Sequence, residues 1–532
     1  MARIIPRVFR KFYPRQRFRH GAVLDAQLPL PFPSSRLSRE IPLLPKQQEQ
    51  EKTPTRPSHP SLARQHPNTE KTHVRNRERT PPAPTPIRPH RHPLHRHTPR
   101  HLHPRSPSRP RGSHKKWHRI RRPPPATELT RFFNSNQDNI SSASYGPHWR
   151  LLRRNLMSEI LHPSRVKTFA EGRKWVLELL IKRLCSIEER GEPVRVQEIF
   201  QHVIFCLLLF MCFGEKLEES AVNEIERVQR RMLVTFSSFN LFAFLPRVGR
   251  LLFRKGWKRA LELRDEREQL MIRLIRARRG RKEGHQDEKT KKSSFEFSYV
   301  DSLFALELAE EGGRKLTEAE IVTLCSEFMT GGTDTTSTAM DWIFANLVKN
   351  QDKQEKLVED IERVVGKDGE IKEEDLQKMR YLKAVILEGL RRHPPGHLLL
   401  SHGVSEEVTL GGYVIPKNAV VNVTIAEIGL DKEVWEDPLE FRPERFLKED
   451  DEEGVDITGS REIKMMPFGV GRRICPALSL AILHLEYLVA NLVREFQWKP
   501  KEEGEIIDLS EKMEFTVVMK NPLEAKIISR RS

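Results

Sequence analysis

The most informative stretch of this chain is residues 467–477, which read PFGVGRRICPA. Two glycines favour a tight turn, two arginines follow them, and Cys475 stands where an apolar helical pattern begins. A helix N-terminus and neighbouring arginines both favour a thiolate over a thiol. The alternative is a buried, inert thiol, which is the usual fate of a lone cysteine. We consider that alternative weak, because inert cysteines rarely lie in loops rich in glycine and arginine.

A second unusual stretch, residues 329–336, reads MTGGTDTT in the middle of a long apolar pattern. Thr317 and Glu320 have the spacing of a capping box, so we expect a helix from there to about Asn350. Two adjacent glycines inside a helix cost about 1 kcal/mol each relative to alanine. Local rules broken in the middle of an element point to a functional site. A simple kink in a packed helix is the other interpretation.

Two further motifs say little when taken alone. Glu388 and Arg391 have the i, i+3 spacing that on a helix usually makes a solvated surface pair, worth about 0.2–0.5 kcal/mol. Residues 441–446 read FRPERF, which indicates a loop held by two aromatic side chains.

In this order and at these spacings, the motifs together resemble the cytochrome P450 family, and in detail its plant microsomal members. The haem loop of that family, F-x-x-G-x-R-x-C-x-G, is matched by Phe468, Gly471, Arg473 and Cys475, with Ala477 where glycine is usual. The oxygen-activation motif is matched by Gly331, Gly332, Asp334 and Thr335, the E-x-x-R motif by Glu388 and Arg391 with Arg445 as their partner, and the W-x-x-x-R helix by Trp149 and Arg153. These matches span residues 145 to about 500.

The resemblance implies a mainly α fold with small β-sheets, in which residues 126–532 form a haem domain. Cys475 would be the axial ligand of the haem iron, and its thiolate would favour cleavage of the O–O bond. The expected cofactor-binding residues are Trp149, Arg153, His402, Phe468, Arg473 and Cys475. Among these, the two arginines and the indole would bind the haem propionates as charge-assisted donors. His402 stands where many members carry an arginine for the same contact.

The resemblance also assigns roles beyond the cofactor loop. Asp334 and Thr335 would be the catalytic pair that relays protons to dioxygen. Glu388, Arg391 and Arg445 would form a buried ion-pair network, which is costly to break on one side. At residue 477 a methyl group replaces a hydrogen, and we expect haem binding to survive with a local shift.

The function implied is a haem-thiolate monooxygenase that inserts one atom of O2 into a small organic substrate. Electrons would come from NADPH through NADPH–cytochrome P450 reductase. The reductase would dock near the Cys475 face of this chain, which would act as a monomer. One alternative is an O2-independent haem-thiolate isomerase or dehydratase, against which the retained Asp334 and Thr335 argue. Another is a truncated, non-catalytic product whose haem domain is broken and which acts through a basic tail.

That tail is residues 1–125, with 29 Lys and Arg against 6 Asp and Glu and 24 of the 37 prolines. We expect it to be disordered, because no apolar residue recurs at helical or strand period. It could bind nucleic acid or another anionic surface, or form a metal site around His90, His92, His95 and His97. The third interpretation is that natural selection has not shaped this segment as protein, for instance because it is translated in a wrong reading frame. We favour the last, since aromatic residues for base stacking are almost absent and no ligand spacing recurs.

The front of the chain is the main departure from the family. Recognisable sequence starts near Asn136, so we expect the membrane anchor and first strands to be missing or replaced. The resemblance implies the endoplasmic reticulum membrane, although no transmembrane anchor is visible in the sequence. The longest apolar run, residues 203–213, is too short for a bilayer, which needs about 20 residues, and predicts a buried core helix. Five widely spaced cysteines without a C-x-x-C pair indicate a reducing compartment.

Overall fold

The structure, a computed structural model, describes residues 120–122, 138–236, 253–283, 295, 297–447 and 455–530. Apart from residues 120–122, the segment 1–125 that was predicted to be disordered lies outside these residues.

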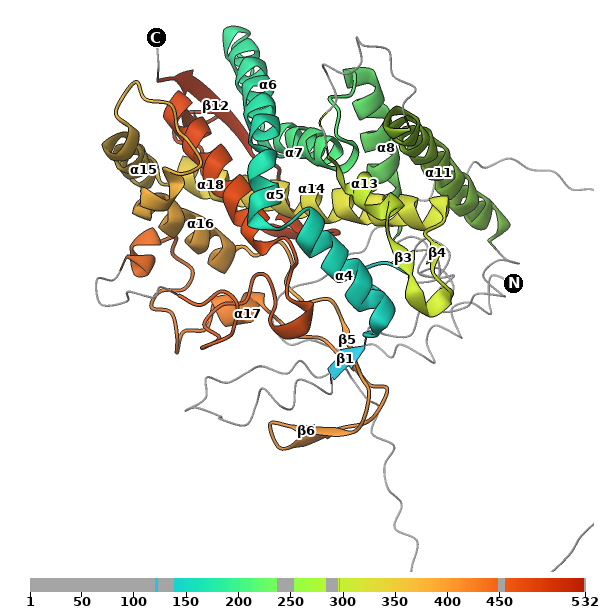
Figure 1. Cartoon of the computed structure of the whole chain (residues 1–532). Coiled ribbons are helices and arrows are strands. Elements are labelled where there is room, and N and C mark those ends of the chain that lie inside the picture. Colours follow the sequence, from blue (N-terminus) through green and yellow to red (C-terminus); the bar gives the residue numbers. More distant parts are fainter. Residues whose placement is uncertain are drawn as a thin grey trace, which may run out of the picture. The chain divides into compact units, whose positions relative to one another are not determined.

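Helices make up most of the described chain (Figure 1). In chain order they are α4 (Pro147–Glu159), α5 (Pro163–Thr168), α6 (Ala170–Glu189), α7 (Val196–Phe213), α8 (Glu219–Phe236), α11 (Arg254–Lys282), α13 (Tyr299–Phe304), α14 (Glu318–Lys349), α15 (Gln351–Val365), α16 (Arg380–Arg392), α17 (Ala426–Gly429) and α18 (Leu478–Glu495). Short 3-10 turns are η3 (Ala309–Glu311), η4 (Leu376–Lys378), η5 (Pro443–Phe446) and η6 (Gly471–Arg473).

The strands are short and pair antiparallel in small sheets, which confirms the predicted fold class. They are β1 (Ile120–Arg122), β2 (Val194–Arg195), β3 (Glu307–Leu308), β4 (Arg314–Lys315), β5 (His402–Val404), β6 (Val408–Leu410), β7 (Tyr413–Ile415), β8 (Val420–Val421), β9 (Phe496–Pro500), β10 (Glu511–Met513), β11 (Val517–Met519) and β12 (Glu524–Ser529). The three-stranded sheets have the orders β1-β5-β8 and β2-β12-β9, and β3-β4, β6-β7 and β10-β11 are hairpins.

Strand β1 corrects one prediction. Its residues 120–122 lie inside the segment 1–125 that was predicted to have no regular structure, yet they pair with β5. The boundary was placed too late, because a three-residue edge strand carries no periodicity of its own and depends on its partner for its hydrogen bonds.

Helix α14 begins where the capping box predicts. The Thr317 hydroxyl accepts a hydrogen bond from the Glu320 N–H at 3.3 Å, and the Glu320 carboxylate accepts one from the Thr317 N–H at 2.7 Å. The helix then runs to Lys349, one residue before the predicted end. These two bonds satisfy donors that a helix start otherwise leaves open, which fixes where α14 enters the core.

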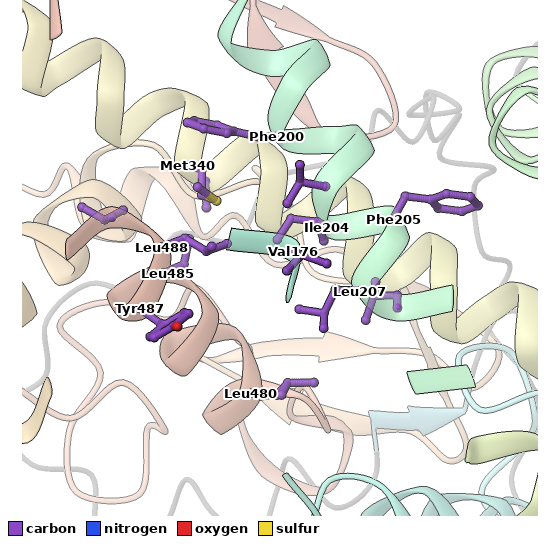
Figure 2. Packing of buried hydrophobic residues seen from close by; sticks show 14 of the residues in the cluster. Val176, Phe200, Ile204, Phe205, Leu207, Met340, Leu480, Leu485, Tyr487 and Leu488 are labelled. Atoms are coloured by element: carbon purple, nitrogen blue, oxygen red, sulfur yellow. The ribbon is translucent and has the colours of Figure 1, made fainter. Parts of the chain in front are cut away.

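Helix α7 packs along α14 and confirms the predicted core helix (Figure 1). It is apolar enough to cross a membrane, but 89% of its 18 residues are buried inside the protein. A helix that is apolar on all sides is buried in a core or in a bilayer, and here the protein covers it. Figure 2 shows Ile204 of α7 in one cluster with Val176 of α6, Met340 of α14 and Leu488 of α18.

One side chain in this apolar core is a carboxylic acid. Asp341 of α14 is 1% exposed, and neither of its carboxylate oxygens has a hydrogen-bond partner within the described residues. Burial raises the pKa of Asp341 to about 7. Because the folded pKa lies above the unfolded one, the carboxyl destabilises the fold progressively as pH rises from about 4 to about 7.

We therefore expect Asp341→Asn to stabilise the protein more at about pH 8 than at about pH 5, by a difference on the order of 2 kcal/mol. Denaturant unfolding at the two pH values measures this difference. The control is Asp368→Asn, at an exposed loop position. A stability change for Asp341→Asn that is the same at both pH values would contradict the prediction.

Candidate functional site

Cys475 lies in the loop between η6 and α18, three residues before the helix begins. Gly469 and Gly471 have φ values of 74° and 73°, in the left-handed region where a side chain is disfavoured. The loop closes when the Cys475 N–H donates to the Phe468 carbonyl at 2.8 Å. The result is a half-buried sulfur at the start of a helix, as the sequence predicted.

The predicted preference for thiolate is only partly met. The Ala477 N–H and the Arg153 guanidinium both act to lower the pKa of Cys475, but burial outweighs them and raises it above its usual value. Both predicted influences therefore act in the predicted direction, and desolvation, which sequence patterns do not show, acts against them. A sulfur in this setting becomes a thiolate when it binds a metal cation.

Three predicted donors gather beside this loop. The Arg153 guanidinium donates to the Ile474 carbonyl at 2.6 Å, and the Arg473 guanidinium donates to the Ala143 carbonyl at 2.6 Å. Both guanidinium carbons lie over the Trp149 ring, at 5.8 Å and 5.2 Å from its centre. Burial, together with the charge of Arg153, lowers the pKa of Arg473, so this cluster of positive charge favours an anionic ligand.

The other two predicted cofactor residues lie on a strand and in the turn before η6. His402, in β5, is half-buried, and burial followed by the charge of Arg473 lowers its pKa. Phe468 packs against the main core while its carbonyl holds Cys475. The Trp149 indole N–H donates to the Ile140 carbonyl at 2.9 Å, a contact that no sequence pattern indicates.

The two glycines inside α14 have different surroundings. A Cβ on Gly332 would lie 2.7 Å from a methyl carbon of Leu208, so this glycine lets α7 approach closely. A Cβ on Gly331 would meet no heavy atom of the described residues within 4 Å, so this face of α14 is open among them. One turn later on the same face, the Thr335 hydroxyl donates to the Gly331 carbonyl at 2.7 Å. The open face of α14 therefore carries the predicted catalytic hydroxyl.

Asp334 points to the neighbouring helix. Its Oδ1 accepts a hydrogen bond from the Gln201 amide of α7 at 3.0 Å. Burial raises the pKa of Asp334 to about 6, although the charge of Arg230 acts against this. A carboxyl with a pKa near neutrality can both take and release a proton at working pH. Gln201 was missed by sequence reasoning, although a polar residue inside an apolar helix was a usable signal.

The predicted ion-pair network is present, and its Glu388–Arg391 pair is fully buried. Glu388 and Arg391 of α16 have side chains that are 0% exposed, and they form a two-pronged pair at 2.7 and 2.8 Å. Arg445 of η5 adds a third contact, with its Nε 3.1 Å from Glu388. The interpretation of Glu388 and Arg391 as a solvated surface pair is therefore wrong.

Comparisons with known proteins agree on one family. The family model for cytochrome P450 matches residues 114–528, which starts earlier than the predicted Asn136. The chain is 47% identical over 417 residues to cytochrome P450 89A9 of Arabidopsis thaliana, covering 76% of this chain and 80% of that protein. It is 31% identical over 368 residues to flavonoid 3'-monooxygenase of Arabidopsis thaliana, covering 68% and 70%.

A solved zebra fish cytochrome P450 with abiraterone has a similar fold. Its TM-score is 0.61 at 21% identity, and the match covers 78% of this chain and 89% of that one. At this identity the likeness concerns the fold alone.

Proposed function

The chain belongs to the cytochrome P450 family and is a haem-dependent monooxygenase, and from that premise we propose that Cys475 is the ligand of its haem iron. The observation that carries this proposal is the place of the sulfur, half-buried at the start of α18 with the Ala477 N–H and Arg153 beside it. The residues around Cys475 suit haem, because a thiolate can bind its iron and the cationic donors can bind its two propionates. Bound haem would supply the activation of O2, helped by the electron density of the thiolate.

Other residues of the chain would bind the haem propionates and shape the loop around Cys475. Arg153, Arg473 and Trp149 would hold the propionates, with His402 at the edge of the same cluster. Ala477 would stand where glycine is usual in the haem loop, and Phe468 would fix the loop that presents the sulfur. Support for these roles comes from the gathering of the donors beside Cys475.

The proton chemistry would belong to α14. Asp334 would hold a proton on its carboxylate and release it toward the Thr335 hydroxyl, on the open face beside Gly331. The raised pKa of Asp334 supports this role, because a donor works best when its pKa is near the operating pH. These two residues also disfavour the O2-independent isomerase or dehydratase.

We further propose that the substrate is a small organic molecule and that electrons come from NADPH through NADPH–cytochrome P450 reductase to a monomer. The endoplasmic reticulum membrane is the location we propose, following the resemblance to plant microsomal members. Among the described residues, α7 is the helix long and apolar enough for a membrane, and it is buried in the core.

A reduced carbon-monoxide difference spectrum of residues 1–532, expressed with haem supplied, tests the proposal. We expect the Soret band typical of thiolate-ligated haem, and a requirement for O2 and NADPH in turnover. A soluble, folded chain without this band would contradict the proposal and favour a non-catalytic product.

We expect Arg473→Gln and Arg153→Gln each to weaken haem binding by roughly tenfold to a hundredfold, because a charge-assisted hydrogen bond contributes about 1.5–3 kcal/mol. Transfer of haem to an excess of apomyoglobin measures the loss. The control is Arg154→Gln, an exposed position on the same helix. If the two variants lost haem to apomyoglobin at the same rate as Arg154→Gln, Arg153 and Arg473 would not bind the propionates.

A further inference from the structure

Two histidines outside the motifs that identify the family share one carboxylate. His393 directly follows α16, and its Nδ1 lies 3.3 Å from one carboxylate oxygen of Glu511 in β10. The Nε2 of His397 lies 3.0 Å from the other oxygen of the same carboxylate. An ionised carboxylate only accepts hydrogen bonds, so each ring presents an N–H to it. We call this group of His393, His397 and Glu511 the clasp.

The hairpin β10–β11 that carries Glu511 is also fastened to α14. The Thr338 and Thr516 hydroxyls lie 2.8 Å apart. The Trp342 indole N–H donates to the Val517 carbonyl at 2.8 Å. Thr338 and Trp342 follow Thr335 at helical spacings of three and seven residues, so they share its face of α14. The hairpin therefore covers the continuation of the face that carries the proposed catalytic hydroxyl.

His393 connects α14 to this hairpin. Its ring lies flat on the Trp342 ring, with the centroids 4.0 Å apart and the planes at 2°. Two residues later, the Pro395 carbonyl accepts a hydrogen bond from the Val517 N–H at 2.8 Å. The segment that holds both histidines is therefore bound to α14 on one side and to the hairpin on the other.

One member of the clasp stays neutral and one stays charged. The His393 side chain is 1% exposed, and its Nε2 has no partner within the described residues. Burial lowers the pKa of His393 to about 4, and the charges of Arg392 and Arg391 act the same way, although the bond to Glu511 opposes them. Burial acts to raise the pKa of Glu511, but the hydrogen bonds of the two histidines outweigh it and lower this pKa to about 2. Near neutral pH the clasp thus has a neutral His393 and an ionised Glu511.

His397 is the member whose charge changes near neutral pH. Its side chain is 28% exposed, so it can exchange protons with solvent. The hydrogen bond to Glu511 raises the pKa of His397 and Glu427 of α17 adds to this, although burial acts against it. Because the folded pKa lies above the unfolded one, the ion pair stabilises the clasp fully below about pH 6.5. This stabilisation is lost as pH rises through the raised pKa.

We propose that the clasp positions the β10–β11 hairpin beside Thr335, and that the charge on His397 makes this hold dependent on pH. With His397 protonated, the carboxylate is held by one charged and one neutral donor, and the hairpin stays against α14. When His397 loses its proton, two neutral donors remain and the hairpin opens more often. The clasp itself does not depend on haem. Its effect on ligands beside Thr335 rests on the proposed function.

The first experiment measures amide hydrogen exchange in residues 511–519 of the haem-loaded full chain, from about pH 6 to about pH 9. Protection relative to an unstructured peptide at the same pH reports how often the hairpin opens. We expect protection to fall roughly threefold to tenfold as pH rises through the pKa of His397, because an ion pair gives way to a neutral hydrogen bond. The paired strands β9 and β12 in the same sample are the internal control and should show no such fall.

Three substitutions separate the charge from the contact. His397→Gln keeps a neutral donor but cannot gain a charge, so its protection should stay at the high-pH level of the unmodified chain throughout. Glu511→Gln removes the charged acceptor and should lower protection at both ends of the range. The matched control is Glu514→Gln on the same hairpin, which breaks a solvent-exposed pair with Lys512 at 2.6 Å and should change little. The melting temperature confirms that each variant is folded.

The second experiment uses imidazole and 1-benzylimidazole, which bind haem iron through nitrogen and shift its Soret band. The two ligands differ by one benzyl group, so the ratio of their dissociation constants isolates contacts beyond the iron. We expect Glu511→Gln to weaken binding of 1-benzylimidazole roughly threefold to tenfold and that of imidazole not at all, because a loosened hairpin offers fewer fixed contacts to the larger ligand. Glu514→Gln should leave both constants unchanged.

The outcomes separate this proposal from the proposed function. A missing thiolate-type carbon-monoxide band sinks the proposed function, and hydrogen exchange still decides on the clasp. Equal protection in Glu511→Gln and Glu514→Gln overturns the clasp. Protection that does not change with pH, or a His397→Gln chain that keeps the original pH dependence, overturns the role of the His397 charge. If both ligands respond alike to Glu511→Gln, the positioning role beside Thr335 is overturned.

Discussion

Replacing Cys475 with alanine is expected to remove the thiolate-type carbon-monoxide band and with it all O2-dependent turnover, while the protein stays folded. The sulfur is half-buried in a loop that is closed by backbone bonds, so its loss opens little space in the core. Cys206, Cys212 and Cys325 are buried in α7 and α14 and offer no substitute ligand at this loop.

The carbon-monoxide spectrum and circular dichroism together measure this outcome. Cys185→Ala, at a half-buried position in α6, is the matched control and should keep the band. Cys475→Ser separates the effect of losing the sulfur ligand from the effect of losing side-chain volume. Serine is about as large as cysteine, but it presents a hard oxygen in place of the soft sulfur. An unchanged band in Cys475→Ala would disprove the ligand assignment.

Replacing Glu388 with glutamine is expected to have the largest effect on stability. Its carboxylate holds Arg391 and Arg445 and also accepts the Arg442 N–H at 2.8 Å. Removing one partner of a buried pair costs about 3–5 kcal/mol, because the remaining charges stay buried without compensation. That is a large fraction of a typical folding free energy of about 5–15 kcal/mol.

Soluble yield, melting temperature and haem content measure the effect together. The control is Glu440→Gln, which breaks the partly exposed contact of Glu440 with Arg442 at 2.7 Å and should change little. If Glu388→Gln had the same melting temperature as Glu440→Gln, the network would contribute no more to stability than a surface ion pair.

The parts of the site that sequence could predict are those whose signals are local. The capping box at Thr317 lies within a few residues of the helix start that it determines, and the unusual glycine pair at Gly331 and Gly332 is itself visible in a short stretch of sequence. The loop around Cys475 is local in the same way, since its turns and its first hydrogen bond join residues 468 to 475. Such short patterns can be recognised without knowing any tertiary contact.

What could not be predicted depends on partners far away in the chain. The bond from Gln201 to Asp334 joins residues 133 positions apart, and the bond from Arg473 to the Ala143 carbonyl joins residues 330 apart. Burial has the same origin, so its effect on the pKa of Cys475 cannot be read from the neighbouring residues. Strand β1 was missed because its order comes from β5.

Strand β12 has a consequence for how the protein is made. It holds β2 through the pairing of Arg195 with Glu524, and the Val196 N–H at the start of α7 donates to the Leu523 carbonyl. On a ribosome that adds 5–20 residues per second, α7 therefore emerges roughly 15–65 s before the strand that anchors it. Its apolar surface is open to chaperones and to aggregation until α14 emerges, and its first residue has no strand partner until β12 follows. Translation speed over residues 196–523 and the supply of chaperones should therefore govern the yield of folded protein.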